Sequence, residues 1–109
     1  MSSGSGTIDR AAVFAALGDS TRLELVARLQ DGRQHCIAQL ADGLELTRQG
    51  VTKHLRVLQR AGVVTCTRVG RESRFVLRPD RISEAGDYLA RASAQWDEAI
   101  ERLRASVED

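Results

Sequence analysis

The sequence predicts a single, mainly α-helical domain that carries one β-hairpin. Its 109 residues are 42% hydrophobic and 28% charged, a composition typical of one globular domain with one core. Apolar residues recur at helical spacing as far as Gly62, where the pattern becomes β-rich and extended. Residues 47–78 hold eight basic residues and one acidic residue, a net charge of +7, and the rest of the chain sums to −6. This basic block, hidden in an overall charge of +1, is typical of a surface that binds a polyanion.

Two helices are expected before residue 33. Ile8 to Leu17 is apolar on nearly every side, which predicts a short helix that is buried on more than one face and ends at Gly18. Asp19 is a plausible N-cap for a second helix, which Gly32 ends. The second helix has a predicted apolar stripe that faces the core: Leu23, Val26, Ala27 and Leu29.

The next two helices are short neighbours joined by a brief turn. HCIAQLADG, residues 35–43, predicts a helix with three inward residues: Ile37, Leu40 and Ala41. Three residues then lead to Thr47, whose hydroxyl can cap a fourth helix that runs to Ala61. The buried face of that helix has i, i+4, i+7 spacing: Val51, Leu55 and Leu58. Two short helices with a glycine in the turn between them form a helix-turn-helix arrangement.

The extended region after Gly62 predicts a β-hairpin, followed by a long helix. The β-rich runs VVTCTRV and SRFVLR bracket the turn sequence GRE. Alternate residues of the second run share a face, with Phe75 and Leu77 on one side and Arg74, Val76 and Arg78 on the other. Pro79 is expected to end the strand, and Asp80 to cap a final helix over about residues 81–107. A helix-turn-helix followed by a basic hairpin is a winged helix-turn-helix.

The final helix has a regular apolar seam. Large residues recur every seven positions, and alanines follow three positions later: Ile82, Leu89, Trp96 and Leu103, with Ala85, Ala92 and Ala99. The stripe could simply cover its own domain. However, fully burying four large side chains is worth on the order of 6 to 12 kcal/mol, comparable with the whole stability of a small domain. We therefore favour a homodimer through the terminal helices, to which Ile8 and Ala12 of the first helix are also assigned.

Three motifs, in order along the chain, resemble the ArsR/SmtB-type bacterial repressors. ALGDSTRLELVARL resembles the opening of their second helix, VTKHLRVLQRAGVV their recognition helix with its Ser/Thr-x-His-Leu core, and RVGRESRFVL their wing. The resemblance covers about 90 residues, from the first helix to the last. It implies a dimeric repressor that binds a palindromic double-stranded DNA operator.

A recognition helix enters the major groove with its N-terminal residues closest to the base edges. Four residues are therefore candidates for base readout: Arg48, Gln49, Thr52 and Lys53. Arg56 and Arg60 are better placed for phosphates, and three arginines of the wing can reach an adjoining minor groove or the backbone: Arg68, Arg71 and Arg74. Thr47 and Gly50 complete the predicted DNA-binding set. A glycine in the first turn costs about 1 kcal/mol against alanine, but it lets the backbone approach DNA closely.

Metal-responsive and thiol-responsive repression are the alternatives. The thiolate site of the family uses Cys-x-Cys at the start of the third helix, where this chain has Cys36 and Ala38. The interfacial site of the family uses Asp and His on the last helix, which has no histidine here. Because tight metal binding takes three or four ligands and His35 with Cys36 supplies two, no metal or other cofactor is expected. Cys36 and Cys66 could form a redox switch, although a buried, inert thiol is the commoner fate of such a cysteine.

Other functional classes fit the sequence less well. An enzyme needs a nucleophile or an acid–base pair in a cleft, and no paired carboxylates or phosphate-binding glycine loop accompany Cys36 and His54. We expect His54 to be a buried or interfacial hydrogen-bonding residue. A winged-helix module for protein interaction would have an apolar or acidic recognition face, and this face is basic. The effector remains unknown from the sequence.

Composition also predicts where the domain starts and where the protein works. Residues 1–6, MSSGSG, read as a mobile tail or a cloning remnant, which leaves residues 7–109 for the winged helix-turn-helix domain and its dimerisation helix. No apolar run approaches the roughly 20 residues of a membrane span, and a secretory h-region is lacking. The expected location is the cytoplasm, with both cysteines reduced.

Overall fold

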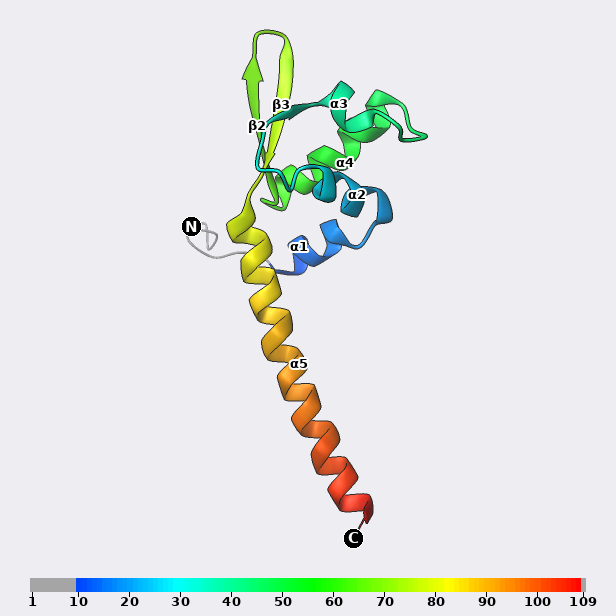
Figure 1. Cartoon of the computed structure of the whole chain (residues 1–109), viewed down its shortest axis with the longest axis vertical. Coiled ribbons are helices and arrows are strands. Elements are labelled where there is room, and N and C mark those ends of the chain that lie inside the picture. The colour runs from blue at the N-terminus through cyan, green and yellow to red at the C-terminus, as the bar shows by residue number, and fades with distance from the viewer. Residues whose placement is uncertain (1–9, 109) are drawn as a thin grey trace, which may run out of the picture.

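The computed structural model describes residues 10–108, so the Ser/Gly-rich tail and Ile8 lie outside the described residues. The elements follow in the order α1 (Arg10–Leu17), α2 (Ser20–Arg28), β1 (His35–Cys36), α3 (Ile37–Ala41), α4 (Arg48–Arg60), β2 (Val64–Val69), β3 (Glu72–Leu77) and α5 (Pro79–Glu108). The first four helices and the sheet form a head, from which most of α5 projects on the side away from the hairpin tip (Figure 1). The predicted mainly helical fold with a hairpin wing is confirmed.

Helix α4 lies at the centre of the head. It packs against α1, α2, α3 and β2. The core is apolar throughout the described residues, with no buried polar or charged side chain: Val13, Ala16, Leu25, Val26, Leu29, Leu40, Val51, Leu55, Leu58, Val63, Val64, Phe75 and Ala85. Burial on this scale is the main force that fixes the orientation of α4 relative to its neighbours.

The predicted apolar stripe of α2 was partly wrong. Val26 and Leu29 are buried as expected, but Leu23 is 51% exposed and Ala27 is also exposed. The core residue that the prediction missed is Leu25, which is fully buried. Leu25 and Leu29 are one helical turn apart and face α1 and α4, whereas Leu23 lies about 200° from Leu25 around the helix. Leu23 therefore points away from the core.

The sheet has three antiparallel strands in the order β1-β3-β2. Strands β2 and β3 form the predicted hairpin, from Val64 opposite Leu77 to Val69 opposite Glu72. Gly70 has φ of +64°, which suits a two-residue turn that begins with glycine. Strand β1 was not predicted: its two residues pair with Phe75 and Arg74, far along the chain. The predicted third helix was therefore too long, because residues 35–36 are extended and only Ile37–Ala41 is helical.

Helix α5 begins earlier than predicted. Pro79 is its first residue rather than the end of the preceding strand, which is physically reasonable because the first helical position needs no N–H and suits the fixed φ of proline. Asp80 lies in the first turn rather than at the cap. The Arg78 guanidinium donates to its carboxylate, with Nη2 3.2 Å from Oδ2, and this hydrogen bond holds the pKa of Asp80 below its usual value.

The start of α5 is anchored on α1. The rings of Phe14 and Tyr88 are 5.9 Å apart and tilted by 44°. The Arg10 guanidinium lies 4.4 Å above the Tyr88 ring, a cation–π contact. These contacts make α1 and the first turns of α5 one packing unit. None of the described helices is both long and apolar enough to cross a membrane.

Candidate nucleic-acid interface

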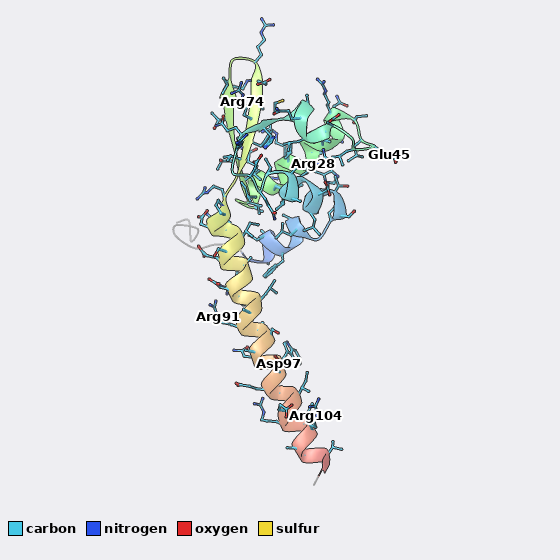
Figure 2. All side chains as sticks on the ribbon, viewed as in Figure 1. Arg28, Glu45, Arg74, Arg91, Asp97 and Arg104 are labelled. Atoms are coloured by element: carbon cyan, nitrogen blue, oxygen red, sulfur yellow. The ribbon has the colours of Figure 1, made fainter. Side chains whose placement is uncertain are left out.

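The start of α4 is fixed by its cap. Thr47 has an extended backbone, and its Oγ1 accepts a hydrogen bond from the Gly50 N–H at 3.0 Å, as the sequence predicted. The preceding turn is held by Arg28, whose Nη1 donates to the backbone carbonyls of Leu40, at 3.1 Å, and Asp42. Figure 2 labels Arg28 within the head, where α2 ends. The two contacts satisfy carbonyls at the end of α3 and hold the approach to α4 in place.

One face of α4 is buried and the opposite face is exposed and basic. Val51, Leu55 and Leu58 are fully buried, as predicted. The residues predicted to contact DNA share the other face: Arg48, Gln49, Thr52, Lys53, Arg56 and Arg60. No acidic residue lies anywhere on the helix.

Thr52 is less available to DNA than the other residues of this face. Its hydroxyl donates to the Arg48 carbonyl oxygen at 2.7 Å. A phosphate oxygen needs a donor, and the hydroxyl has only one proton to give. Thr52 can therefore offer DNA an acceptor and a methyl group but not a donated hydrogen bond.

A groove of about 760 Å³ lies between α4, the start of α3 and the tip of the hairpin. Its lining combines residues from these three elements and from the end of β1: Cys36, Ile37, Ala38, Arg48, Gln49, Thr52, Lys53, Arg71, Glu72 and Ser73. The groove thus brings the four candidates for base readout together with one predicted wing residue, Arg71. The other four arginines of the predicted set do not line it: Arg56, Arg60, Arg68 and Arg74.

The cations of the groove are not neutralised by neighbouring side chains. Within residues 10–108, the side chains of Arg48, Lys53 and Arg71 make no hydrogen bond or ion pair with the protein. Arg74 differs, because its Nε lies 2.9 Å from Glu72 Oε2. The arginine at the hairpin tip is therefore better able to meet an anion than the one further down the strand, a distinction that charge counting in the sequence did not make.

The sequence did not identify the α3 side of the groove. Cys36 and its neighbours reach it because β1 pairs with β3, which places Cys36 opposite Arg74. A two-residue strand carries no periodicity that could have revealed this pairing.

The same sheet keeps the two cysteines apart. Both are half-buried and free, Cys36 on β1 and Cys66 on β2, with β3 between them. Two strand spacings put their Cα atoms about 10 Å apart, beyond the roughly 4.4 to 6.8 Å that a disulfide spans. The sheet therefore does not allow a disulfide between Cys36 and Cys66.

No metal-binding cluster is present among residues 10–108, where no three His, Cys, Asp or Glu side chains come together. His35, one of the two candidate ligands, is engaged elsewhere: its Nε2 lies 2.8 Å from Asp31 Oδ2. Hydrogen bonds from the Arg33 N–H and from His35 hold the pKa of Asp31 below its usual value.

His54 makes a hydrogen bond within the protein, as predicted. Its Nδ1 lies 3.2 Å from Arg22 Nη1 and 3.9 Å from Asp19 Oδ1. Asp19 caps α2 by accepting from the backbone N–H groups of Arg22 and Thr21. The Arg22 N–H, more than any other group, holds the pKa of the Asp19 carboxyl below its usual value. His54 is therefore part of a polar contact between α4 and the start of α2.

The predicted dimer seam divides into two parts. Ile82 is half-buried and Ala85 is 5% exposed, because the first turns of α5 pack on the core of their own domain. Ala85 and Ile82 are therefore covered mainly by their own domain, and their assignment to the dimer interface stays a prediction. Further along, Leu89, Trp96 and Leu103 are 55%, 70% and 67% exposed. The projecting segment, on which Figure 2 labels Arg91, Asp97 and Arg104, lies beyond the head.

Two members of the projecting seam were missed by the seven-residue count. Ile100 and Val107 are exposed and lie on the same side of α5 as Trp96 and Leu103, at i, i+4, i+7 and i+11 from Trp96. Ala92 and Ala99 are half-buried along this face, as is Ala12 on α1. The outer half of α5 therefore presents a continuous apolar stripe.

The chain is similar to known helix-turn-helix proteins. Residues 10–67 match a family described as a helix-turn-helix domain. An uncharacterized HTH-type transcriptional regulator of Methanocaldococcus jannaschii is 30% identical over 74 residues, 68% of this chain and 83% of that protein. The HTH-type transcriptional regulator CmtR of Mycobacterium bovis is 39% identical over 85 residues, 78% of this chain and 65% of that protein.

The HTH-type transcriptional repressor SmtB of Mycobacterium tuberculosis is 40% identical over 60 residues, 55% of this chain and 44% of that protein. Among solved structures, an ArsR-like transcriptional regulator from Rhodococcus sp. RHA1 superposes with a TM-score of 0.72 at 35% identity, covering 86% of this chain and 88% of that one. The fold, the basic groove and these likenesses agree. The chain belongs to the ArsR/SmtB-type helix-turn-helix transcriptional regulators, a family of DNA-binding repressors.

Proposed function

We propose that this regulator binds a palindromic operator as a homodimer, with α4 of each protomer in a major groove and the hairpin as a wing beside it. The observation that supports this most strongly is the groove lined by Arg48, Lys53 and Arg71, which form no ion pair within residues 10–108, while its acidic residue, Glu72, pairs with Arg74. Three unpaired cations around a concave surface favour a polyanion over a neutral or acidic partner.

The position of each residue suggests its role. Arg48 and Gln49 lie in the first turn of α4, the part of a recognition helix that reaches base edges. Arginine can bond guanine with two hydrogen bonds, and glutamine can do the same with adenine. Lys53, also a candidate for base readout, and Arg71 lie on different elements of the groove and are suited to the phosphates of one strand. Arg56 and Arg60, further along α4, would extend the phosphate contacts.

The uncovered half of α5 supplies the reason for dimerisation. Trp96, Ile100, Leu103 and Val107 are large apolar residues that the chain leaves in water. Pairing two copies through this stripe would bury it twice over. A two-fold pair also carries two recognition helices, so we expect operator half-sites about one helical turn apart.

Salt dependence of DNA binding tests the proposal. If a dimer neutralises about six to eight phosphates, the logarithm of the affinity should fall against the logarithm of salt concentration with a slope of about −5 to −7. Operator sequences are first selected from a random DNA pool and then titrated at several salt concentrations. A flat response would contradict the proposal, as would failure to shift any genomic fragment, the result expected of a protein-interaction module.

A matched pair of variants locates the contacts. Arg71→Gln removes a cation from the groove, and Arg91→Gln removes an exposed cation from α5, far from the groove. The first should make the salt slope shallower by about 2, one phosphate for each protomer. The second should leave the slope unchanged. Equal slopes for the two variants would mean that Arg71 does not contact a DNA phosphate.

A thiol response remains as the second candidate, because Cys36 lines the groove. Since the sheet separates Cys36 from Cys66, such a response would act through Cys36 alone or through a bond between chains. Oxidant should then weaken DNA binding by the wild type and leave Cys36→Ser unaffected, while non-reducing electrophoresis reports any cross-linked dimer. Equal responses of wild type and Cys36→Ser would rule out Cys36 as a sensor.

A further inference from the structure

Arg22 joins three helices through one guanidinium. From its place on α2, its Nε donates to the Ala16 carbonyl and its Nη2 donates to the Ala15 carbonyl at 3.2 Å. Its Nη1 reaches His54 Nδ1 on α4, also at 3.2 Å. The two carbonyls belong to the last turn of α1, where carbonyls lack partners within the helix. Because α1 has no basic residue of its own there, Arg22 supplies the positive charge that this helix end favours.

The same contacts connect the recognition helix to α5. Helix α1 is fastened to α5 by Phe14 against Tyr88 and by Arg10 over the Tyr88 ring. A chain of contacts therefore runs from α5 through α1 to Arg22, and from Arg22 to His54 on α4. His54 is the member on the recognition helix itself, one position after the groove residue Lys53.

We propose that Arg22 and His54 are positioning residues for DNA binding, which together hold α4 at a fixed angle to the α1–α5 unit. The inference rests on the proposed function, since α5 joins the two protomers only in the proposed dimer. In that dimer, the angle between α4 and α5 sets how the two recognition helices lie relative to one another. A small tilt of α4 would then misalign both helices with half-sites whose spacing is fixed.

The link requires a neutral His54. An arginine side chain has only donors, so Nδ1 of His54 must accept, which places the ring proton on Nε2. A proton on Nδ1 removes that acceptor and sets two cations side by side. Asp19, at 3.9 Å, offsets the new charge only in part, because its Oδ1 already accepts two backbone N–H groups.

Among the described residues, no charged side chain on the elements that pack against α4 is placed to replace the link. Three elements besides α2 pack against α4, namely α1, α3 and β2. Within the described residues, Arg10 is the only charged residue of α1 and lies over Tyr88, α3 has none, and Arg68 of β2 reaches the Gly70 carbonyl. On α2 itself, the remaining charges, Glu24 and Arg28, pair with one another at 3.2 Å.

The experiment compares two substitutions of His54. Asn places an amide oxygen near the position of Nδ1 and cannot be protonated, whereas Leu removes the acceptor. Operator affinity is measured at pH 8 and pH 5.5 for the full chain, with thermal unfolding and sedimentation at each pH to confirm a folded protein of unchanged oligomeric state. Losing a hydrogen bond to a charged group corresponds to about tenfold in affinity or more.

The expected pattern separates positioning from simple charge. His54→Leu should bind about tenfold more weakly than the wild type at pH 8, and His54→Asn should bind nearly as tightly. The wild type should lose affinity at pH 5.5, the range in which histidines take up protons, while His54→Asn should not lose it. An added positive charge would by itself tighten DNA binding at pH 5.5, so the sign of the change is decisive.

Control variants complete the test. His35→Asn removes the only other histidine and should keep the pH-dependent loss. Should His54→Leu fail to fold, the pH profiles of the wild type and His54→Asn carry the test without it. Parallel profiles for those two proteins, or tighter binding by the wild type at pH 5.5, would overturn the inference. A wild type that binds no DNA at pH 8 would overturn the proposed function instead, which keeps the two failures distinct.

Discussion

Helix α4 and the outer half of α5 carry similar apolar stripes, but the stripe of α4 is buried and the stripe of α5 is exposed. In α4 the stripe is fully buried against α1, α2, α3 and β2. In α5, Trp96 and Leu103 remain largely exposed. The polar faces of the two helices also differ in charge. All charged residues of α4 are basic, whereas α5 carries both signs, as in the pair of Arg104 with Glu101 at 3.0 Å.

This contrast shows which side of each helix needs a partner. The apolar face of α4 is covered by other elements of the same chain. The basic residues on its exposed face are therefore the groups that need a partner of opposite charge. The charged residues of α5 can pair with one another, so its exposed apolar stripe is the surface that needs a partner. One chain can therefore display both a nucleic-acid surface and a self-association surface without the two competing for residues.

The largest effect should come from the buried stripe of α4. Leu55→Ala is expected to lower the free energy of unfolding by about 2–5 kcal/mol, because it leaves a cavity among fully buried neighbours. Leu103→Ala makes the same truncation on α5 and should cost about 0.5 kcal/mol or less when the protein is dilute enough to be monomeric. Urea unfolding of both variants measures this difference. Equal losses of stability would mean that Leu103 is buried within the monomer as Leu55 is.

The next effect concerns self-association. Trp96→Glu should weaken the dimer by about 2–4 kcal/mol, because a large anchor is replaced by a charge. Ala94→Glu adds the same charge on the opposite side of α5 and should leave the dimer intact. Sedimentation equilibrium distinguishes the two. A wild type that stays monomeric at high concentration would show that the α5 stripe serves another purpose.

The smallest effect is predicted at the helix glycines. A Cβ at Gly50 would meet Thr47 Oγ1 at 3.4 Å and the Leu46 Cβ at 3.8 Å, so alanine should fit. Gly50→Ala is expected to stabilise the fold by up to about 1 kcal/mol. It should also weaken operator binding if the backbone at this position approaches DNA closely, as we propose. Gly86→Ala on α5, where a Cβ would meet nothing within 4 Å, should give a similar gain in stability with no change in DNA affinity. Unchanged affinity for Gly50→Ala would mark Gly50 as a tolerated helix defect.

The parts of the fold that the sequence predicted well have strong local signals. Helix α4 was expected to run from a Thr47 cap to Ala61, and it spans Arg48–Arg60 because cap, periodicity and terminal glycine agree. The hairpin was equally clear, since a glycine turn lies between two β-rich runs. The basic face of α4 followed directly from the helical period.

The missed features depend on contacts between distant residues. Strand β1 exists because residues 35–36 pair with β3, and neither residue shows this in its local pattern. The α3 side of the groove was missed for the same reason. The choice between Leu23 and Leu25 depended on where α1 and α4 lie around α2, which helical periodicity alone does not decide.

Strand β1 also affects the conformational entropy that the protein loses when it binds DNA. Its pairing with Phe75 and Arg74 ties β3, the middle strand of the sheet, to the residue before α3, so both walls of the groove belong to one connected framework. A wing joined to the head only through its own two strands would have to be immobilised when DNA arrives, at a cost in conformational entropy. In this protein the separation of the two walls is set during folding, so the groove is preorganised for its ligand.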